Sequence, residues 1–243
     1  IPAASTNLKN TKRQVGQYVM QRLTYKKIEE ISLIRLDDGK ANAMGPEMIK
    51  ELNEAIDKAE EESRALLITG RPGLLSGGFD LTIIRSGDND AIRSMVKSGA
   101  KLLMRIYGFP KPIVMATSGH GVALGGFLLL AADYRFGASG DFKIGLNEVA
   151  IGMTLPPFAL MLAKARIANQ FLTNSAINAN MFNPETAKLA GFLDEVSNPS
   201  ELLSNSIDKT KELATLDLSA FKQTKNDFRS ADIQRILANL EAQ

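Results

Sequence analysis

A glycine-rich segment at residues 118–133 has residue types that could hold a negatively charged oxygen. An apolar run at residues 112–116 precedes it and predicts a buried strand, and an apolar helix is expected from about Gly126. Glycines let the chain turn tightly and let a ligand approach the main chain. The first N–H groups of a helix have no partner inside the helix. The segment therefore predicts an anion site or an oxyanion hole, with a close-packed strand–helix corner as the alternative.

Residues 71–81 form a second glycine-rich segment, and they follow an apolar run at residues 65–69 that predicts another buried strand. The segment lacks the Gly-Lys-Ser/Thr ending of a P-loop and the GxGxxG pattern of a dinucleotide site. A plain surface connection is the alternative reading. Because Leu75, Phe79 and other apolar residues are interspersed with small ones, we expect this loop to be partly buried.

Composition removes several classes of chemistry. The chain has 243 residues and no cysteine, which excludes disulfides, thiolate nucleophiles and Cys-ligated zinc. His120 is the only histidine, so a multi-histidine metal site is impossible and a Ser-His-Asp triad would have to use it. The net charge of +2 indicates no strong attraction to nucleic acid, and no apolar run approaches the roughly 20 residues of a membrane span. We expect no metal, no nucleic-acid partner and no membrane span.

The hydrophobic pattern predicts a mixed α/β chain. Residues 25–36 are rich in β-forming residues, and an Asp-Asp-Gly sequence at residues 37–39 predicts a hairpin turn after them. Further strands are expected at residues 65–69, 112–116, 134–138 and 141–144, and helices at residues 46–62, 88–107, 156–168, 169–178, 184–190, 199–215 and 217–241. Residues 1–24 begin with a polar, basic stretch and are expected to form a peripheral arm that resembles a transit-peptide remnant.

Three motifs, in this order and at this spacing, resemble the crotonase superfamily of acyl-CoA enzymes. They are Leu-Leu-Ser-Gly-Gly-Phe-Asp-Leu at residues 74–81, a Gly-Val-Ala-Leu-Gly-Gly-Phe segment at residues 121–133, and an Ile-Gly-Leu-Asn-Glu segment at residues 144–152. Residues 42–44 (Asn-Ala-Met) and residues 187–196 also follow the family's pattern. The resemblance covers about residues 25–230 and rests on all the motifs together, because each one alone is weak.

The resemblance implies a spiral core of repeated ββα units over residues 25–183 and a C-terminal helical region, residues 184–243, that packs trimers, often paired into hexamers. It also implies a coenzyme A thioester substrate and no tightly bound cofactor. The thioester oxygen would lie between the backbone N–H groups of Phe79 and Gly126, and one such donor contributes about 3–4 kcal/mol to stabilising an enolate. The neighbouring residues that would bind the substrate are Gly77, Gly78, Asp80, His120, Gly125 and Leu129.

The carboxylates distinguish the reactions of the family. The resemblance implies that hydratases hold water with two glutamates, but this chain has Leu129 and Glu148 at those positions. It also has Phe127 where a third glycine is common. One carboxylate suits isomerisation of a 3-enoyl thioester, because a single base takes the C2 proton and returns it at C4. The Arg-Pro-Gly sequence at residues 71–73 and the segment at residues 144–148 are similar to those of Δ3,Δ2-enoyl-CoA isomerases. The flanking apolar residues Leu146, Val149 and Ile151 should raise the pKa of Glu148 above about 4.3.

Alternatives exist for the reaction and for individual residues. Besides isomerisation, the chain could hydrate 2-enoyl-CoA despite Leu129, cleave β-diketones with the help of His120, or be an inactive scaffold. A surface or salt-bridged acid is the alternative for Glu148, a structural hydrogen bond for His120, and a loop cap for Asp80.

The remaining expectations concern the contacts to coenzyme A, two structural residues and the cellular location. Arg71, Lys222 and Lys225 are candidates to bind the phosphates of coenzyme A, and Asp133 and Arg135 are expected to be structural. We expect a cytoplasmic location, with mitochondrial and peroxisomal locations as alternatives.

Overall fold

The computed structural model describes residues 17–242, so residues 1–16 of the expected arm lie outside the described residues. The mixed α/β fold predicted from the sequence is confirmed. The strands are β1 (Gln17–Val19), β2 (Leu23–Ile28), β3 (Ile31–Leu36), β4 (Ala65–Thr69), β5 (Gly73–Ser76), β6 (Ile113–Thr117), β7 (Gly119–Val122), β8 (Tyr134–Ala138), β9 (Ile144–Gly145) and β10 (Glu195–Ser197). The helices are α1 (Pro46–Glu62), α2 (Leu81–Ile84), α3 (Asn89–Tyr107), α4 (Leu124–Ala131), the 3-10 helix η1 (Val149–Ile151), α5 (Pro157–Arg166), α6 (Asn169–Ala176), α7 (Pro184–Ala190), α8 (Leu202–Ala214) and α9 (Leu218–Glu241).

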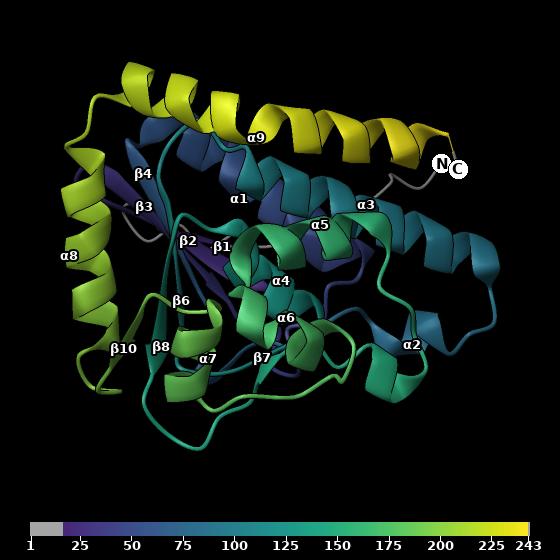
Figure 1. Cartoon of the computed structure of the whole chain (residues 1–243). Coiled ribbons are helices and arrows are strands. Elements are labelled where there is room, and N and C mark those ends of the chain that lie inside the picture. Colours follow the sequence, from purple (N-terminus) through teal and green to yellow (C-terminus); the bar gives the residue numbers. More distant parts are fainter. Residues whose placement is uncertain (1–16, 243) are drawn as a thin grey trace, which may run out of the picture.

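A seven-stranded sheet with the order β1-β2-β3-β4-β6-β8-β10 runs through the molecule. Its first three strands pair antiparallel, and β3 onward pair parallel. Helix α8 packs against one face, and the other helices of the core pack against the other face (Figure 1). Strands β4 and β6 are buried along their whole length, which explains why they appear in the sequence as unbroken apolar runs.

Three successive ββα units build the core around this sheet. In each unit the first strand joins the large sheet, and the second strand joins a small parallel sheet with the order β5-β7-β9. The units are β4–β5 with α2 and α3, β6–β7 with α4, and β8–β9 with η1 and α5. Because β5, β7 and β9 are parallel, the loops that leave them emerge at the same edge of the small sheet.

The hairpin turn predicted at residues 37–39 is wrong. The hairpin between β2 and β3 turns at residues 29–30, and residues 37–39 instead lead from β3 toward α1. Glu29 adopts a φ of 50° in this hairpin, a conformation that glycine or asparagine would have signalled in the sequence. The Asp38 carboxylate accepts the backbone N–H of Asn42 at 2.9 Å, so this aspartate shapes a wider connection rather than a hairpin.

The sheet begins before residue 25, where we predicted the start of the core. Strand β1 pairs with β2, and Leu23 at the start of β2 is buried. This residue faces the core because β2 packs against α1, and an apolar side chain there gains free energy by leaving water. The boundary predicted between residues 183 and 184 stays a prediction.

Helix α9 crosses the outer side of the core and is held by buried ion pairs. Figure 1 shows it running along the outer side of α3, with which it is in contact. The Asp133 carboxylate, which follows α4, accepts from Lys225 Nζ at 2.7 Å and from Arg229 at 2.9 Å. It also accepts the backbone N–H of Ile113 at 2.9 Å. Asp133 therefore ties the last helix to the central strand β6.

No helix among residues 17–242 combines the length and the apolar character that crossing a bilayer requires.

Candidate active site

Loops from the three strands of the small sheet meet around a pocket of about 250 Å³. Phe79 comes from the loop after β5, Ala123 from the turn after β7, and Glu148 from the segment after β9. The rest of the pocket is lined by Gly77, Leu81, Ile84, Arg85, Asn147, Ile151 and Met153. Three motifs that are far apart in the sequence therefore line one pocket, and its wall is mostly apolar.

Glycines let the loops approach one another more closely than side chains would allow. A Cβ atom built on Gly125 would lie 2.4 Å from the backbone oxygen of Ser76. A Cβ atom built on Gly78 would lie 2.9 Å from the Cβ of Ala123. Gly78 also has a φ of 107°, a backbone conformation that favours glycine. The glycines of the two motifs are therefore required where one main chain packs on another.

The two N–H groups expected to bind the thioester oxygen donate to no acceptor within residues 17–242. Helix α4 begins at Leu124, earlier than the predicted start near Gly126, so Gly126 is its third residue. The next N–H, that of Phe127, donates to the carbonyl of Ala123 at 3.1 Å. The N–H of Gly126 thus belongs to the unsatisfied first turn, where the helix dipole is positive, and the N–H of Phe79 is unpaired as well. Their role as an oxyanion hole stays a prediction.

Glu148 is the acid of this pocket. Only 9% of the residue's surface is exposed, and its Oε2 atom has no hydrogen-bond partner in the described part of the chain. Burial raises the pKa of Glu148 to about 7, partly opposed by a hydrogen bond with its own backbone. Of the three neighbours expected to cover it, Leu146 is buried, whereas Val149 and Ile151 are 47% and 51% exposed, so segments distant in sequence also contribute to its burial. Such a carboxyl group is suited to exchange protons near neutral pH.

The other predicted substrate-binding residues take different positions. Gly77 lines the pocket, whereas Gly78 and Gly125 lie where the loops pack together. The Asp80 carboxylate accepts the backbone N–H of Thr82 at 2.8 Å and so forms the N-cap of α2. The cap is the structural role that we gave as the alternative for Asp80.

His120 and Leu129 lie outside the lining of the pocket. The Nδ1 atom of His120 accepts the backbone N–H of Lys143 at 2.9 Å, and its ring packs edge-on against Phe142 with 5.8 Å between centroids. This geometry matches the structural alternative for His120 and gives no support to β-diketone cleavage. Leu129 is fully buried in α4, beside Gly121. An apolar side chain therefore stands where the hydratase pattern has its other glutamate.

Two supporting residues were missed in the sequence. Asn42 is fully buried, and its side-chain amide donates to the carbonyls of Leu36 and Leu75 at 3.0 Å each, which joins β3 to β5. Gly99 lies in α3, where an added Cβ would be 2.5 Å from the ring of Phe79. The Asn-Ala-Met sequence could have pointed to Asn42, but no local pattern marks Gly99 because its contact depends on how α3 packs.

A second pocket, of about 530 Å³, adjoins the first and shares Gly77, Phe79 and Leu81 with it. Its cationic lining residues are Arg22 and Lys40. The cations named from the sequence lie elsewhere: Arg71 donates from Nε to the carbonyl of Lys40 at 2.8 Å, and Lys225 is bound to Asp133. Lys222 is exposed on α9 and lines neither pocket.

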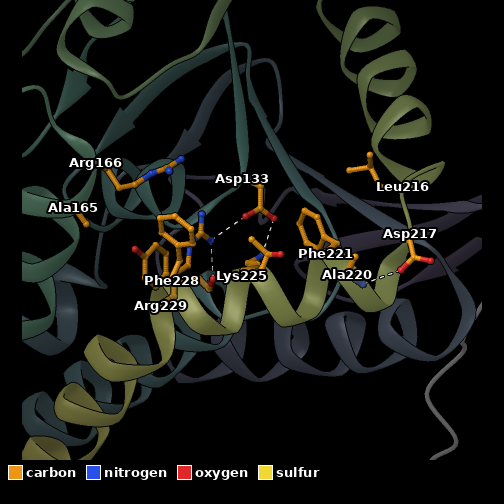
Figure 2. Close-up of a pocket in the computed structure, with 12 residues that line it drawn as sticks. Asp133, Ala165, Arg166, Leu216, Asp217, Ala220, Phe221, Lys225, Phe228 and Arg229 are labelled. Carbon is orange, nitrogen blue, oxygen red and sulfur yellow. Dashed lines mark hydrogen bonds and ion pairs between the residues drawn. The ribbon is translucent and has the colours of Figure 1, made fainter.

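A third pocket, of about 640 Å³, lies beside α9 and contains none of the predicted catalytic residues. Figure 2 shows Phe221, Phe228 and Arg229 projecting around it from α9, opposite Arg166. The side chain of Phe228 is 84% exposed. Burial lowers the pKa of Arg166 to about 10, and its Nε atom has no partner in the described residues.

No group of three or more His, Asp or Glu side chains that could hold a metal ion occurs within residues 17–242.

Comparison with known proteins places this geometry in a family. The family described as enoyl-CoA hydratase/isomerase matches residues 26–242 of the chain. The chain belongs to this family. The crotonase resemblance predicted from the motifs is thereby confirmed, and the protein is an enzyme of that superfamily.

Individual members of the enoyl-CoA hydratase/isomerase family differ in their named reactions. The chain is similar to a solved family protein from Pseudomonas syringae, with 40% identity, 90% and 94% of the two chains covered and a TM-score of 0.87. It is equally similar to a solved enoyl-CoA hydratase, EchA3, from Mycobacterium ulcerans, with 40% identity, 90% and 96% covered and a TM-score of 0.87. It is 27% identical to the mitochondrial enoyl-CoA delta isomerase 1 of Mus musculus, over 87% of this chain and 75% of that protein. Family membership therefore does not choose between hydration and isomerisation.

Proposed function

We propose that this enzyme converts 3-enoyl-CoA to 2-enoyl-CoA, with Glu148 as the single proton shuttle and the N–H groups of Phe79 and Gly126 as the oxyanion hole. One observation carries the proposal. Among the residues that the structure describes, Glu148 is the only acid that lines the pocket, and none of them makes a hydrogen bond with its buried Oε2. Phe79, whose N–H is unpaired, lines the same pocket.

The chemistry follows from these positions. The carboxylate of Glu148 takes a proton from C2 of the thioester, and the electrons move through the C3–C4 double bond and the carbonyl to give a dienolate. The negative charge on the thioester oxygen is stabilised by the two N–H groups and by the positive end of α4. Neutral Glu148 then returns the same proton to C4, and the double bond lies between C2 and C3. A pKa of about 7 makes this carboxyl both base and acid near neutral pH.

Replacing Glu148 by glutamine tests the proposal. Glu148→Gln keeps the size of the side chain but removes the base, so we expect conversion of trans-3-hexenoyl-CoA to fall by about 100-fold or more. Binding of an unreactive acyl-CoA, measured by calorimetry, should change little because the N–H donors and the pocket remain.

Glu185→Gln is the matched control, since Glu185 is an exposed acid in the first turn of α7. It should leave the rate unchanged. Normal turnover by Glu148→Gln would remove Glu148 from the mechanism, and a wild-type protein that hydrates 2-enoyl-CoA but leaves 3-enoyl-CoA untouched would replace isomerisation by hydration.

We propose that the coenzyme A part of the substrate binds in the second pocket, which adjoins the Glu148 pocket and shares Phe79 with it. Its lining also includes the acids Asp38, Glu47 and Asp80, so the groups that could attract the phosphates are the two lining cations, Lys40 and Arg22. Arg22 is already paired with Glu51 at 3.1 Å, so Lys40 is the stronger candidate. No tightly bound cofactor is needed for this proton transfer, and a cytoplasmic location stays a prediction.

We further propose that the enzyme assembles as a trimer, which pairs into a hexamer. The exposed ring of Phe228 beside the apolar third pocket supports this, because a large apolar side chain in water at a concave surface is typical of an interface (Figure 2).

A further inference from the structure

Ala123 adopts a backbone conformation that an L-residue with a side chain rarely takes. Its φ is 53° and its ψ is −119°, close to the first central residue of a type II′ turn, a position dominated by glycine. Ala123 lies between β7 and α4 and lines the pocket that contains Glu148. A strained residue of this kind persists only where the surrounding structure determines its conformation.

The main chain on both sides holds Ala123 in place. Its N–H donates to the carbonyl of Gly145 at 3.0 Å, which fixes it to β9. Its carbonyl accepts the N–H of Phe127 at 3.1 Å and so receives the first hydrogen bond of α4. These two bonds would form equally well with glycine, and glycine would adopt the same dihedral angles without strain. The methyl group of Ala123 therefore needs a separate explanation.

The methyl group packs against the other donor loop. A Cβ built on Gly78 would lie 2.9 Å from the Cβ of Ala123, so the methyl lies directly against the backbone of Gly78. The next N–H after Gly78 is that of Phe79, and the turn at Ala123 leads into the first helical turn that carries the N–H of Gly126. The loops carrying the two unpaired N–H groups touch here and at Gly125, which packs on the backbone oxygen of Ser76, and Ala123 supplies the side-chain part of this contact.

We propose that Ala123 is a positioning residue, whose methyl group sets the distance between the N–H groups of Phe79 and Gly126, and that the strained backbone is the cost of placing a methyl there. The inference rests on the proposed function, because it gives this spacing a role in holding the thioester oxygen. Removing the methyl lets the two loops approach, and the N–H groups then no longer match one oxygen atom.

The test compares Ala123→Gly with Ala179→Gly. Ala179 has the same φ of 53° but lies in the loop after α6, outside the pocket lining, so its replacement removes another alanine of positive φ without touching the donor loops. Three quantities are measured on the full chain. They are the enolate fraction of bound acetoacetyl-CoA by its absorbance, kcat and KM for trans-3-hexenoyl-CoA, and the thermal midpoint.

We expect Ala123→Gly to lower the enolate fraction and to lower kcat by about 10-fold or more, with KM nearly unchanged, because misplaced catalytic groups cost rate more than binding. Its thermal midpoint should equal or exceed that of the wild type. Ala179→Gly should retain the wild-type kcat and enolate fraction.

Other results would overturn the inference. An unchanged enolate fraction in Ala123→Gly would show that the methyl group does not determine the distance between the two N–H groups of the oxyanion hole. A fall in the thermal midpoint together with equal losses of binding and rate would give Ala123 a purely structural role. If the wild type binds acetoacetyl-CoA as the enolate but does not isomerise 3-enoyl-CoA, the proposed reaction fails while the enolate measurement still decides the role of Ala123.

Discussion

At the scale of the residue, the pocket contains one mostly buried carboxyl group, that of Glu148. Glu148 is buried and its Oε2 has no hydrogen-bond partner among residues 17–242, whereas a purely structural buried acid is expected to be paired. Asp133 illustrates the structural case, because its buried carboxylate contacts Lys225, Arg229 and the backbone of Ile113. The contrast favours a chemical role for Glu148 and a structural one for Asp133.

The pH dependence of the rate follows from the raised pKa of Glu148. Its base form is needed to take the C2 proton, so kcat/KM should be constant above about pH 7 and fall about tenfold per pH unit below it. The measurement is a pH profile of kcat/KM with 3-enoyl-CoA between pH 5 and 9. A rate that stays constant down to pH 5 would contradict the assignment of Glu148 as the base.

The same group makes stability depend on pH. Folding raises the pKa of Glu148 from its ordinary value of 4.5 to about 7. Between these values the folded chain keeps a proton that the unfolded chain releases, so the stabilisation is complete below pH 4.5 and is lost as the pH rises through 7. A shift of this size corresponds to about 3 kcal/mol. The wild type should therefore lose about 3 kcal/mol more free energy of unfolding than Glu148→Gln between pH 4.5 and 8, in urea titrations at both pH values. Glu185→Gln should behave like the wild type.

At the scale of the element, the small sheet β5-β7-β9 brings the motifs together, and close packing sets their distances. Helix α3 contributes although it carries no lining residue of the pocket. The ring of Phe79 packs so close to Gly99 that an added Cβ would be 2.5 Å from a ring carbon. The main chain of Phe79 is thus positioned partly by a glycine on a distant helix.

Gly99→Ala tests this support. Alanine favours a helix interior by about 1 kcal/mol over glycine, but the ring of Phe79 must move to make room for the methyl group. We expect a small change in thermal midpoint and a fall in kcat of about 10-fold, from displacement of the N–H of Phe79. Ser98→Ala, at the neighbouring position of α3, is the control and should retain the wild-type kcat. Equal rates in the two variants would show that the ring position does not affect the site.

At the scale of the whole molecule, α9 closes the core and presents an apolar surface. Lys225 and Arg229 hold its inner side against Asp133, as Figure 2 shows. Phe228, from the same stretch of helix, is 84% exposed beside the third pocket. The helix therefore has a buried ionic contact on its inner side and an exposed aromatic ring on its outer side.

The proposed trimer can be tested at Phe228. Because the ring is exposed, Phe228→Asp should leave the single chain folded. The new charge would lie in the proposed interface and should prevent association. The mass measured by light scattering should therefore fall from that of three or six chains to that of one. Lys222→Asp, another exposed position of α9, should keep the wild-type mass. A wild-type protein that is monomeric at micromolar concentration would contradict the proposal.

The fold class, the family and most helices and strands could be predicted from the amino-acid sequence. Unbroken apolar runs predicted β4 and β6, and Pro46 marked the start of α1, because burial and backbone restrictions act within a few residues. The hairpin at residues 29–30 escaped prediction, since Glu29 carries no turn signal and adopts a positive φ only because β2 and β3 pair around it.

The tertiary structure alone decided which groups are paired, buried or strained. It placed His120 outside the pocket, left Oε2 of Glu148 inside it with no hydrogen-bond partner in the described part of the chain, and brought the methyl of Ala123 against Gly78. None of these facts is encoded by neighbours in the sequence. Hydrogen bonding, burial and close contact depend on the segments that the folded chain brings within a few ångströms, and in this protein those segments come from three separate strands of the small sheet.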